Sequence, residues 1–282
     1  MGKYKIIIDS TVYLDEKTIK ENDIDIASLN VIEGENSYRE VEVSVQFIFD
    51  EQDKGKSWTT SQPSPGEFLE LYEQAFKDGY EKVFVSGLSK DISGTYQSAS
   101  LAKNMLDDSE KVYIFDTQLA AYGTEMIALE LIRLRNNGVE FDSIIKQMNN
   151  LIKHSGQMFT VENLFSLVKG GRLSAAKAAI GTVLRVKPVI KIVDGKLKLV
   201  HSERTYKKLH KYIIDEMKRT SEGYKRIHIY ITNQFSPGSG EVMKSVIMEH
   251  FPDAEITYTD YLGPVFSIHV GRKGYGISWC WE

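Results

Sequence analysis

The feature that most constrains the fold is a set of short apolar runs in the first half of the chain. They read "KIIID" at 5–9, "KVFVSG" at 82–87 and "KVYIFD" at 111–116. A strand covered on both faces has this composition, and such strands are typical of parallel sheets. Helical patterns follow the runs, at 94–106, at 119–137 and at the i, i+3, i+4, i+7, i+8 positions Phe68, Leu71, Tyr72, Ala75 and Phe76. This alternation predicts an α/β domain with a mostly parallel sheet.

The second half of the chain predicts a different sheet. We expect strands at 156–162, 187–200, 226–232, 255–260 and 266–271, and helices at about 163–169, 174–184, 205–221 and 239–250. Asp194 and Gly195 separate two alternating runs, which is a hairpin signal and predicts antiparallel pairing. We therefore predict an N-terminal α/β domain over 1–155 and a C-terminal α/β domain with a mixed or antiparallel sheet over 156–282.

Composition narrows the classes of function. The 282 residues are 42% hydrophobic and 26% charged, with a formal net charge of −4 and no long basic block. Nucleic-acid binding is not indicated, because phosphate contacts need clustered Lys and Arg. Cys280 is the only cysteine, which rules out an intramolecular disulfide and fits a reducing compartment. The chain has no run of 18 apolar residues and no signal-peptide pattern, so we expect a cytoplasmic protein without a membrane span.

The stretch "TTSQPSPGEF" at 59–68 contains more hydroxyls than a helix start needs. Ser64 is a good N-cap, Pro65 suits the first helical position, and Glu67 completes a capping box. Thr59, Thr60 and Ser61 lie upstream of the helix and are not needed as caps. Local rules alone favour a solvated loop for these three residues.

Two further polar loops follow apolar runs. Ser93-Gly94-Thr95 opens a helix after the run at 82–87, so that free N–H groups are expected to point toward the ends of the strands. That arrangement favours an anion, and Gly94 would let a ligand approach the backbone. The alternative, that Ser93 is simply an N-cap, is equally weighted. Asp9-Ser10-Thr11 is a third polar loop, and its alternative is a cap for a following helix.

The later motifs leave both structural and functional interpretations open. "KGGRLS" fits a helix that ends at Gly170 and a new N-cap at Ser174. The small residues at 178–182 suit either tight helix packing or a slender apolar ligand. A lone histidine in a strand-like run, as His269 is, is more often structural than catalytic, although it can donate to a carboxylate.

Signatures of common catalytic sites are missing from the sequence. It contains no Walker A motif, no GxSxG elbow, no HExxH and no Cys/His cluster. We therefore expect no cofactor, no metal site and no nucleotide site.

Five motifs together resemble the DegV family: "TSQPSPGEF", "ISGTYQSA", "KGGRLS…GTVLRVKPVI", "DGKL" and "GPVFSIHVG", in register over nearly the whole chain. The resemblance implies a two-domain α/β protein that holds one long-chain fatty acid in an apolar tunnel between its domains. It also implies a carrier, not an enzyme, which presents the carboxylate to a separate ATP-dependent fatty acid kinase. That kinase forms acyl phosphate for phospholipid synthesis.

The resemblance also suggests roles for individual residues. It places the fatty acid carboxylate with Thr60, Ser61, Ser93, the Gly94 amide and His269, and it links Arg204 to the kinase encounter. The chain departs from the family in two places. "DSTVYL" replaces the usual D-S-T-S-D-L, so Val12 and Tyr13 receive no polar role. Arg272 and Lys273, in "GRKG", replace a neutral Gly-Pro-Gly. These two charges either alter the contact with the head group or the partner or are merely exposed.

The residues alone keep other functions open. One alternative is a lipid-directed serine hydrolase that uses Ser93 or Ser61 with His269 and Asp9, and another is a fatty-acid-responsive regulator. Hydrophobic burial favours the carrier, because about 14 methylenes at about 0.8 kcal/mol each give roughly 11 kcal/mol before binding costs. An ionised carboxylate removed from water then needs several donors, which the hydroxyls, the amide and the histidine would supply.

Overall fold

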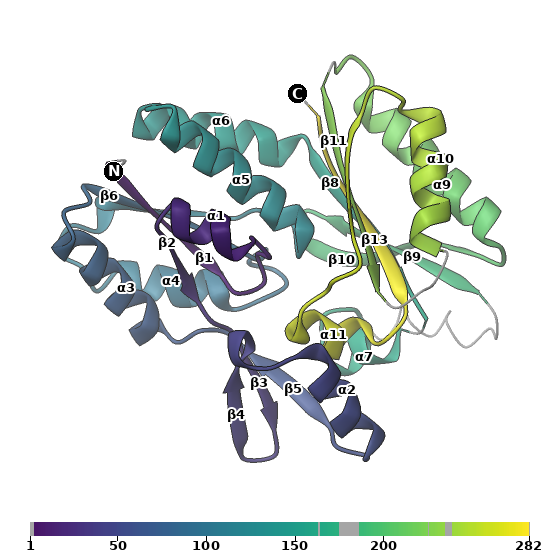
Figure 1. The fold of residues 1–282 in the computed structure, drawn as a ribbon, viewed down its shortest axis with the longest axis horizontal. Coiled ribbons are helices and arrows are strands. Elements are labelled where there is room, and N and C mark those ends of the chain that lie inside the picture. The colour runs from purple at the N-terminus through teal and green to yellow at the C-terminus, as the bar shows by residue number, and fades with distance from the viewer. Residues whose placement is uncertain (1–2, 163, 175–185, 225, 235–238, 282) are drawn as a thin grey trace. The chain divides into compact units, whose positions relative to one another are not determined.

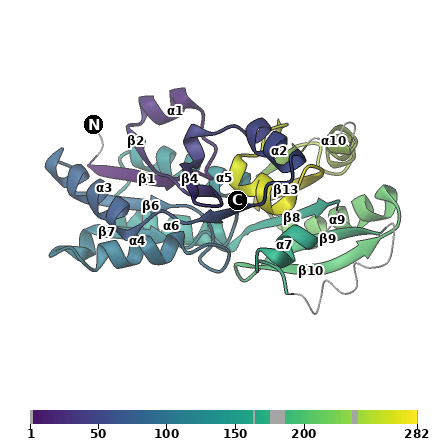
Figure 2. The same cartoon turned by 90° about the horizontal axis from the view of Figure 1, so that it is seen from below.

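The computed structural model describes residues 3–281 except 163, 175–185, 225 and 235–238. The chain forms two compact units. The first comprises residues 1–153 together with Gly263–Val265, and the second comprises residues 154–262 and 266–282. Figures 1 and 2 show the elements of both units along the chain.

A four-stranded parallel sheet forms the centre of the first unit. Its strands are β1 (Tyr4–Asp9), β2 (Ile24–Ala27), β6 (Lys82–Ser86) and β7 (Val112–Phe115), in the order β2-β1-β6-β7. All three pairings are parallel. The predicted parallel sheet is confirmed, and the three apolar runs supply three of its four strands. Every residue of β1 is buried, as expected for a strand covered on both faces.

Helices cover both faces of this sheet (Figure 1). They are α3 (Pro65–Lys77) and α4 (Thr95–Lys103) on one face, and α5 (Tyr122–Asn136) and α6 (Phe141–Lys153) on the other. A short helix, α1 (Glu16–Glu21), follows β1. Since side chains alternate along a strand, Val83 and Val85 pack in the core with α3 and α4. Phe84 lies between them in sequence and stacks on Phe141 of α6, with ring centroids 4.4 Å apart.

The start of α3 confirms half of the predicted capping box. Ser64 accepts a hydrogen bond from the Glu67 backbone N–H at 3.1 Å, and Pro65 opens the helix. The Glu67 side chain does not return to Ser64. Its Oε1 accepts from the Ser28 backbone N–H and from Arg39, both at 3.0 Å, so that part of the prediction was wrong. The carboxylate instead binds a charged donor outside the helix, and a charge-assisted hydrogen bond of this kind is stronger than a neutral one.

The first unit also contains a small antiparallel sheet that the sequence analysis missed. It consists of β3 (Asn30–Glu33), β4 (Asn36–Arg39) and β5 (Trp58–Ser61), in the order β4-β3-β5. Between β4 and β5 lie a 3-10 helix, η1 (Glu40–Glu42), and α2 (Val45–Asp53). The expectation of a loop at 59–61 was therefore wrong, because β5 takes its hydrogen bonds from β3, far upstream in sequence.

The second unit is built on a mixed six-stranded sheet, as predicted. Its strands are β8 (Ser155–Val161), β9 (Lys187–Val193), β10 (Lys196–Glu203), β11 (Ile227–Gln234), β12 (Glu255–Thr259) and β13 (Gly274–Trp281), in the order β10-β9-β8-β13-β11-β12. The β11–β12 pair is parallel, and the other pairings are antiparallel. Asp194 (φ 52°) and Gly195 (φ 76°) form the predicted hairpin turn, which needs positive φ at both positions.

Helices α9 (Tyr206–Ser221) and α10 (Ser239–His250) share a core with this sheet, through residues such as Ile213, Met243 and Trp279. A second cluster includes residues of α7 (Phe165–Lys169) and the end of α11 (Pro264–Val270). The predicted strand at 266–271 was wrong, because those residues belong mainly to α11. β-Branched and aromatic residues suggested a strand, but Pro264 and the contacts of the first helical turn decide the conformation. Residues 175–184 of the helix predicted at 174–184 lie outside the described residues.

Candidate functional site

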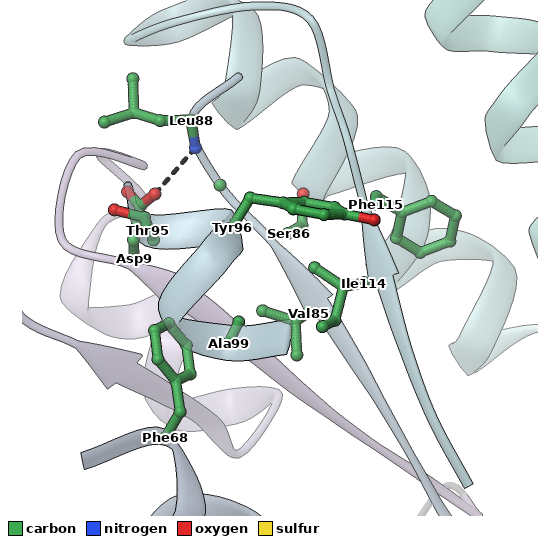
Figure 3. Close-up of a pocket in the computed structure, with 11 residues that line it drawn as sticks. Asp9, Phe68, Val85, Ser86, Leu88, Thr95, Tyr96, Ala99, Ile114 and Phe115 are labelled. Carbon is green, nitrogen blue, oxygen red and sulfur yellow. Dashed lines mark hydrogen bonds between the residues drawn. The ribbon is translucent and has the colours of Figure 1, made fainter. Parts of the chain in front are cut away.

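Polar loops gather at the carboxyl ends of β1 and β6 in the first unit. Asp9, at the end of β1, is 1% exposed and accepts a hydrogen bond from the Leu88 N–H at 2.8 Å (Figure 3). It also accepts one from the Thr11 N–H at 2.9 Å. A Cβ at Gly87 would lie 2.1 Å from Asp9 Oδ2, so only glycine fits there. Burial raises the pKa of Asp9 above its ordinary value, although its hydrogen bonds act in the opposite direction. Asp9 therefore braces two loops, and Asp15 instead caps the following helix.

A small pocket of about 10 Å³ lies beside Asp9 (Figure 3). Asp9, Ser86 and Thr95 form its polar part, and apolar side chains such as Phe68 and Ile114 form the rest. Ser86 is fully buried, and its hydroxyl has no hydrogen-bond partner within the described chain. Small-molecule sites usually measure roughly 300–1,000 Å³, so this pocket alone is too small for a long acyl chain.

Ser93 and Gly94 stand at the start of α4, as predicted. The Ser93 hydroxyl lies 2.9 Å from Thr95 Oγ1 and accepts weakly from the Thr95 N–H at 3.3 Å. The alternative that Ser93 is the N-cap was wrong, because Gly94 takes that position without a side-chain cap. Within the described chain, the backbone N–H groups of Gly94, Tyr96 and Gln97 have no acceptor. These amides keep the capacity to bind an anion, and the helix dipole favours one there.

The end of β5 lies against the start of α4. A Cβ on Gly94 would approach the Gln62 side chain to 2.8 Å, so Gly94 allows these two segments to pack closely. Thr60 and Ser61 are consecutive in β5 and half-buried, and their side chains leave opposite faces of the strand. A single bound carboxylate is therefore expected to meet one hydroxyl of this pair, while Thr59 is exposed.

In the second unit, His269 packs against the Gly-Gly turn that follows α7. A Cβ on Gly170 would lie 2.9 Å from His269 Nδ1. Burial, and then the positive charge of Arg172, lower the pKa of His269 to about 4. The imidazole is therefore neutral at pH 7 and offers one N–H donor.

Arg172 is a candidate that the sequence analysis did not assign. It is half-buried, its Nη1 donates to the Gly170 carbonyl at 2.6 Å, and burial lowers its pKa. No carboxylate of the described residues acts on its pKa, which burial alone lowers. An arginine that directly follows a Gly-Gly pair could have been noted from "KGGR", but its burial and its place beside His269 depend on the fold.

Arg204 and the two charged departures occupy other places. Arg204 is exposed, directly after β10 and before Thr205, the N-cap of α9. Lys273 is exposed and lies 3.6 Å from Glu162, an ion pair of two side chains that are each 59% exposed. Such a pair contributes little to stability. Arg272 is half-buried.

The geometry disfavours the hydrolase alternative. A Ser-His-Asp arrangement needs a carboxylate that orients the histidine. The recorded hydrogen bonds of Asp9 come from Thr11 and Leu88, and none comes from a histidine of the described chain. No group of three or more metal-binding side chains occurs among the residues that the structure describes. In the same part of the chain, no helix is both long and apolar enough to cross a membrane.

We predict that Gly170→Ala displaces the His269 ring, because the added methyl group would overlap it. Since burial is the main cause of the low value, the pKa of His269 should rise from about 4 toward the ordinary value of about 6.5. NMR titration of the imidazole protons measures this. Gly276→Ala is the matched control in the same unit, because its Cβ would make an ordinary contact at 3.5 Å. An unchanged titration in Gly170→Ala would contradict the described packing.

Comparison with known proteins covers the whole chain. Residues 3–282 match the family model described as "Uncharacterised protein, DegV family". A DegV domain-containing protein of Listeria innocua is 30% identical over 279 residues, which cover 98% of each chain. One from Staphylococcus aureus is 31% identical over 285 residues, covering 98% of this chain and 97% of the other.

Two solved structures have the same fold over their full length. A fatty-acid-binding DegV family protein from Thermus thermophilus gives a TM-score of 0.89 at 27% identity, and both chains are covered completely. DegV from Bacillus subtilis, a fatty acid binding protein, gives 0.85 at 28% identity, again with complete coverage. The chain therefore belongs to the DegV family.

Proposed function

We propose that this protein binds one long-chain fatty acid. The observation that carries the proposal is the full-length match, at 27% and 28% identity, to two DegV structures whose proteins bind fatty acids. The polar groups of each unit fit the same chemistry, because they are mainly donors and none is a catalytic pair. A negatively charged ligand would accept the hydrogen bonds that these groups can donate.

The carboxylate is the demanding part of such a ligand. An ionised carboxylate taken from water without donors costs several kcal/mol. In the first unit, Ser93, the free amides at the start of α4 and one hydroxyl of the Thr60–Ser61 pair can donate. In the second unit, neutral His269 and the half-buried cation of Arg172 can do so. We propose that donors from this set hold the carboxylate, as the family resemblance implies.

Lipid analysis tests binding itself. Protein purified from cells grown with fatty acid available should release a free fatty acid of about one equivalent when it is denatured and extracted. Mass spectrometry identifies the chain. Protein that is empty under these conditions, and that takes up no added oleate, would rule out the proposal.

Ser93→Ala and His269→Ala should each weaken fatty acid binding. A hydrogen bond to a charged group contributes about 1.5–3 kcal/mol, so each loss should weaken binding roughly tenfold to a hundredfold. Titration with a fluorescent fatty acid measures the affinity. Ser64→Ala is the control, because Ser64 is another serine at a helix start but serves only the Glu67 amide of α3. If both variants bind like Ser64→Ala, neither residue contacts the carboxylate.

We further propose that the protein is a cytoplasmic carrier that presents the carboxylate to a separate ATP-dependent fatty acid kinase. The kinase would transfer the terminal phosphoryl group of ATP to a carboxylate oxygen, releasing ADP and leaving an acyl phosphate for phospholipid synthesis. The family resemblance supports this role, as does the lack of any nucleotide motif in the sequence. Arg204 is exposed and therefore available to a partner.

Arg204→Ala should lower the rate of acyl phosphate formation by a fatty acid kinase without changing fatty acid affinity. The reason is that an exposed cation contributes to the encounter and not to the buried carboxylate site. Phosphoryl transfer from labelled ATP measures the rate, and Lys207→Ala, a nearby exposed cation, is the control. Equal rates for wild type and Arg204→Ala would remove Arg204 from the encounter surface.

A further inference from the structure

The loop between β7 and α5, residues 116–121, makes contacts that the proposed site does not yet use. It reads "DTQLAA", and Thr117 within it is fully buried. The Thr117 hydroxyl donates a hydrogen bond to the Gly87 carbonyl at 2.7 Å and accepts one from the Leu119 N–H at 3.3 Å. Thr117 therefore joins this loop to the loop that follows β6.

A chain of hydrogen bonds continues from Leu119 to Ser93. The Leu119 carbonyl accepts from the Ser89 N–H at 3.0 Å, and the Ser89 carbonyl accepts from the Ser93 N–H at 3.1 Å. Thr117 thus holds Leu119, Leu119 holds Ser89, and Ser89 holds the backbone of Ser93. All of these residues belong to the first compact unit.

The backbone of this loop has an uncommon conformation. Gln118 (φ 55°) and Ala121 (φ 48°) have positive φ, although neither is glycine. Residues of this kind persist where the surrounding contacts determine the conformation, and they are frequent at ligand sites. Gln118 is exposed, so the contacts of its two buried neighbours, Thr117 and Leu119, hold the turn.

The loop after β6 is held from two sides. β6 lies between β1 and β7 in the sheet. Asp9, at the end of β1, accepts from the Leu88 N–H at 2.8 Å, and Thr117, after β7, donates to the carbonyl of the preceding Gly87. A loop with contacts to both neighbouring strands is preorganised where it enters α4, and a preorganised donor loses less conformational entropy when a ligand binds.

We propose that Thr117 is a positioning residue for the fatty acid head group: through Leu119 and Ser89, it sets where the Ser93 hydroxyl stands. Thr117 needs no contact with the ligand for this role. The inference rests on the proposed function, because it assigns Ser93 to the carboxylate. The chain of hydrogen bonds can also be tested in the ligand-free protein.

Three variants separate this role from general stability. Thr117→Val keeps the branched shape of the side chain but removes the hydroxyl, whereas Thr117→Ser keeps the hydroxyl. Thr124→Val is the matched control, because Thr124 is equally buried and its hydroxyl donates to the Ala121 carbonyl at 2.5 Å, at the start of α5. Both valine variants leave a carbonyl without this donor, so both should be less stable than wild type.

The experiment measures oleate affinity at pH 7 and the Ser93 backbone amide resonance of the ligand-free protein. Thr117→Val should weaken binding roughly five- to tenfold and shift the Ser93 resonance, because Ser89 loses its fixed partner. Thr117→Ser and Thr124→Val should bind like wild type and leave this resonance in place.

A double-mutant cycle adds a measurement that a loss of stability alone would not change. If Thr117 acts through Ser93, Thr117→Val should weaken oleate binding by less than about twofold in the Ser93→Ala background. A further loss as large as the one in wild type would show that Thr117 acts independently of Ser93, and it would overturn the inference.

Thr117→Val with wild-type affinity and an unmoved Ser93 resonance would also overturn it. Hydrogen exchange of wild type decides the matter even if Thr117→Val does not fold. The amides of Leu119, Ser89 and Ser93 should have similar protection, and a Ser93 amide that exchanges freely beside a protected Leu119 amide would contradict the proposal. If wild type binds no oleate at all, the proposed function fails, and the Ser93 resonance in ligand-free Thr117→Val still decides whether Thr117 positions Ser93.

Discussion

A buried carboxylate at the end of the first strand holds the polar edge of the first unit together. Asp9 binds the backbone of the loop after β1 and the backbone of the loop after β6. The second loop leads into α4, where Ser93 and the unoccupied amides stand. A side chain at position 87 would overlap Asp9, so Asp9 can pack against the loop after β6 only because Gly87 is glycine. The position of the anion-binding amides thus depends on a side chain that needs no ligand contact of its own.

Acidic groups near a proposed carboxylate site require a physical explanation. Ionised side chains close to an anionic ligand would repel it, particularly in surroundings with little water. Asp9 and Glu40 are both buried, and burial raises the pKa of each above its ordinary value. Both carboxyls also accept hydrogen bonds from the chain. Glu40, whose pKa is about 8, is protonated at pH 7 and therefore adds little repulsion, while His269 remains neutral and Arg172 keeps a positive charge.

Local sequence patterns predicted the elements whose causes are local. The apolar runs gave β1, β6 and β7, the Asp194-Gly195 pair gave the hairpin, and Ser64 gave the start of α3. Patterns failed where the partner is distant. The polar residues of β5 form a strand because they pair with β3. At the start of α11, a backbone amide donates a hydrogen bond to Glu40, which is distant in sequence. No local rule contains these contacts.

The candidate site shows the same division. Motif resemblance pointed to Ser93, Gly94 and His269, but which way each hydroxyl of Thr60 and Ser61 faces follows from the β5 pairing. The sequence shows Arg172 within "KGGR", but it does not show that this arginine is half-buried beside His269. Glu40 gave no signal at all, because Val265, whose amide donates to it, lies 225 residues further along the chain. Burial and long-range contacts therefore supply what a single sequence lacks.

The central claim is that a fatty acid carboxylate is held beside His269. The most direct test is NMR on the complex with a fatty acid labelled with ¹³C at its first two carbons. We expect NOE contacts between the α-methylene protons of the fatty acid and the His269 imidazole protons. We also expect a carboxyl resonance that stays in its ionised position well below the pKa of the free acid, since nearby donors favour the charged form. A carboxyl that titrates as it does in water, with no contact to His269, would contradict this placement of the head group.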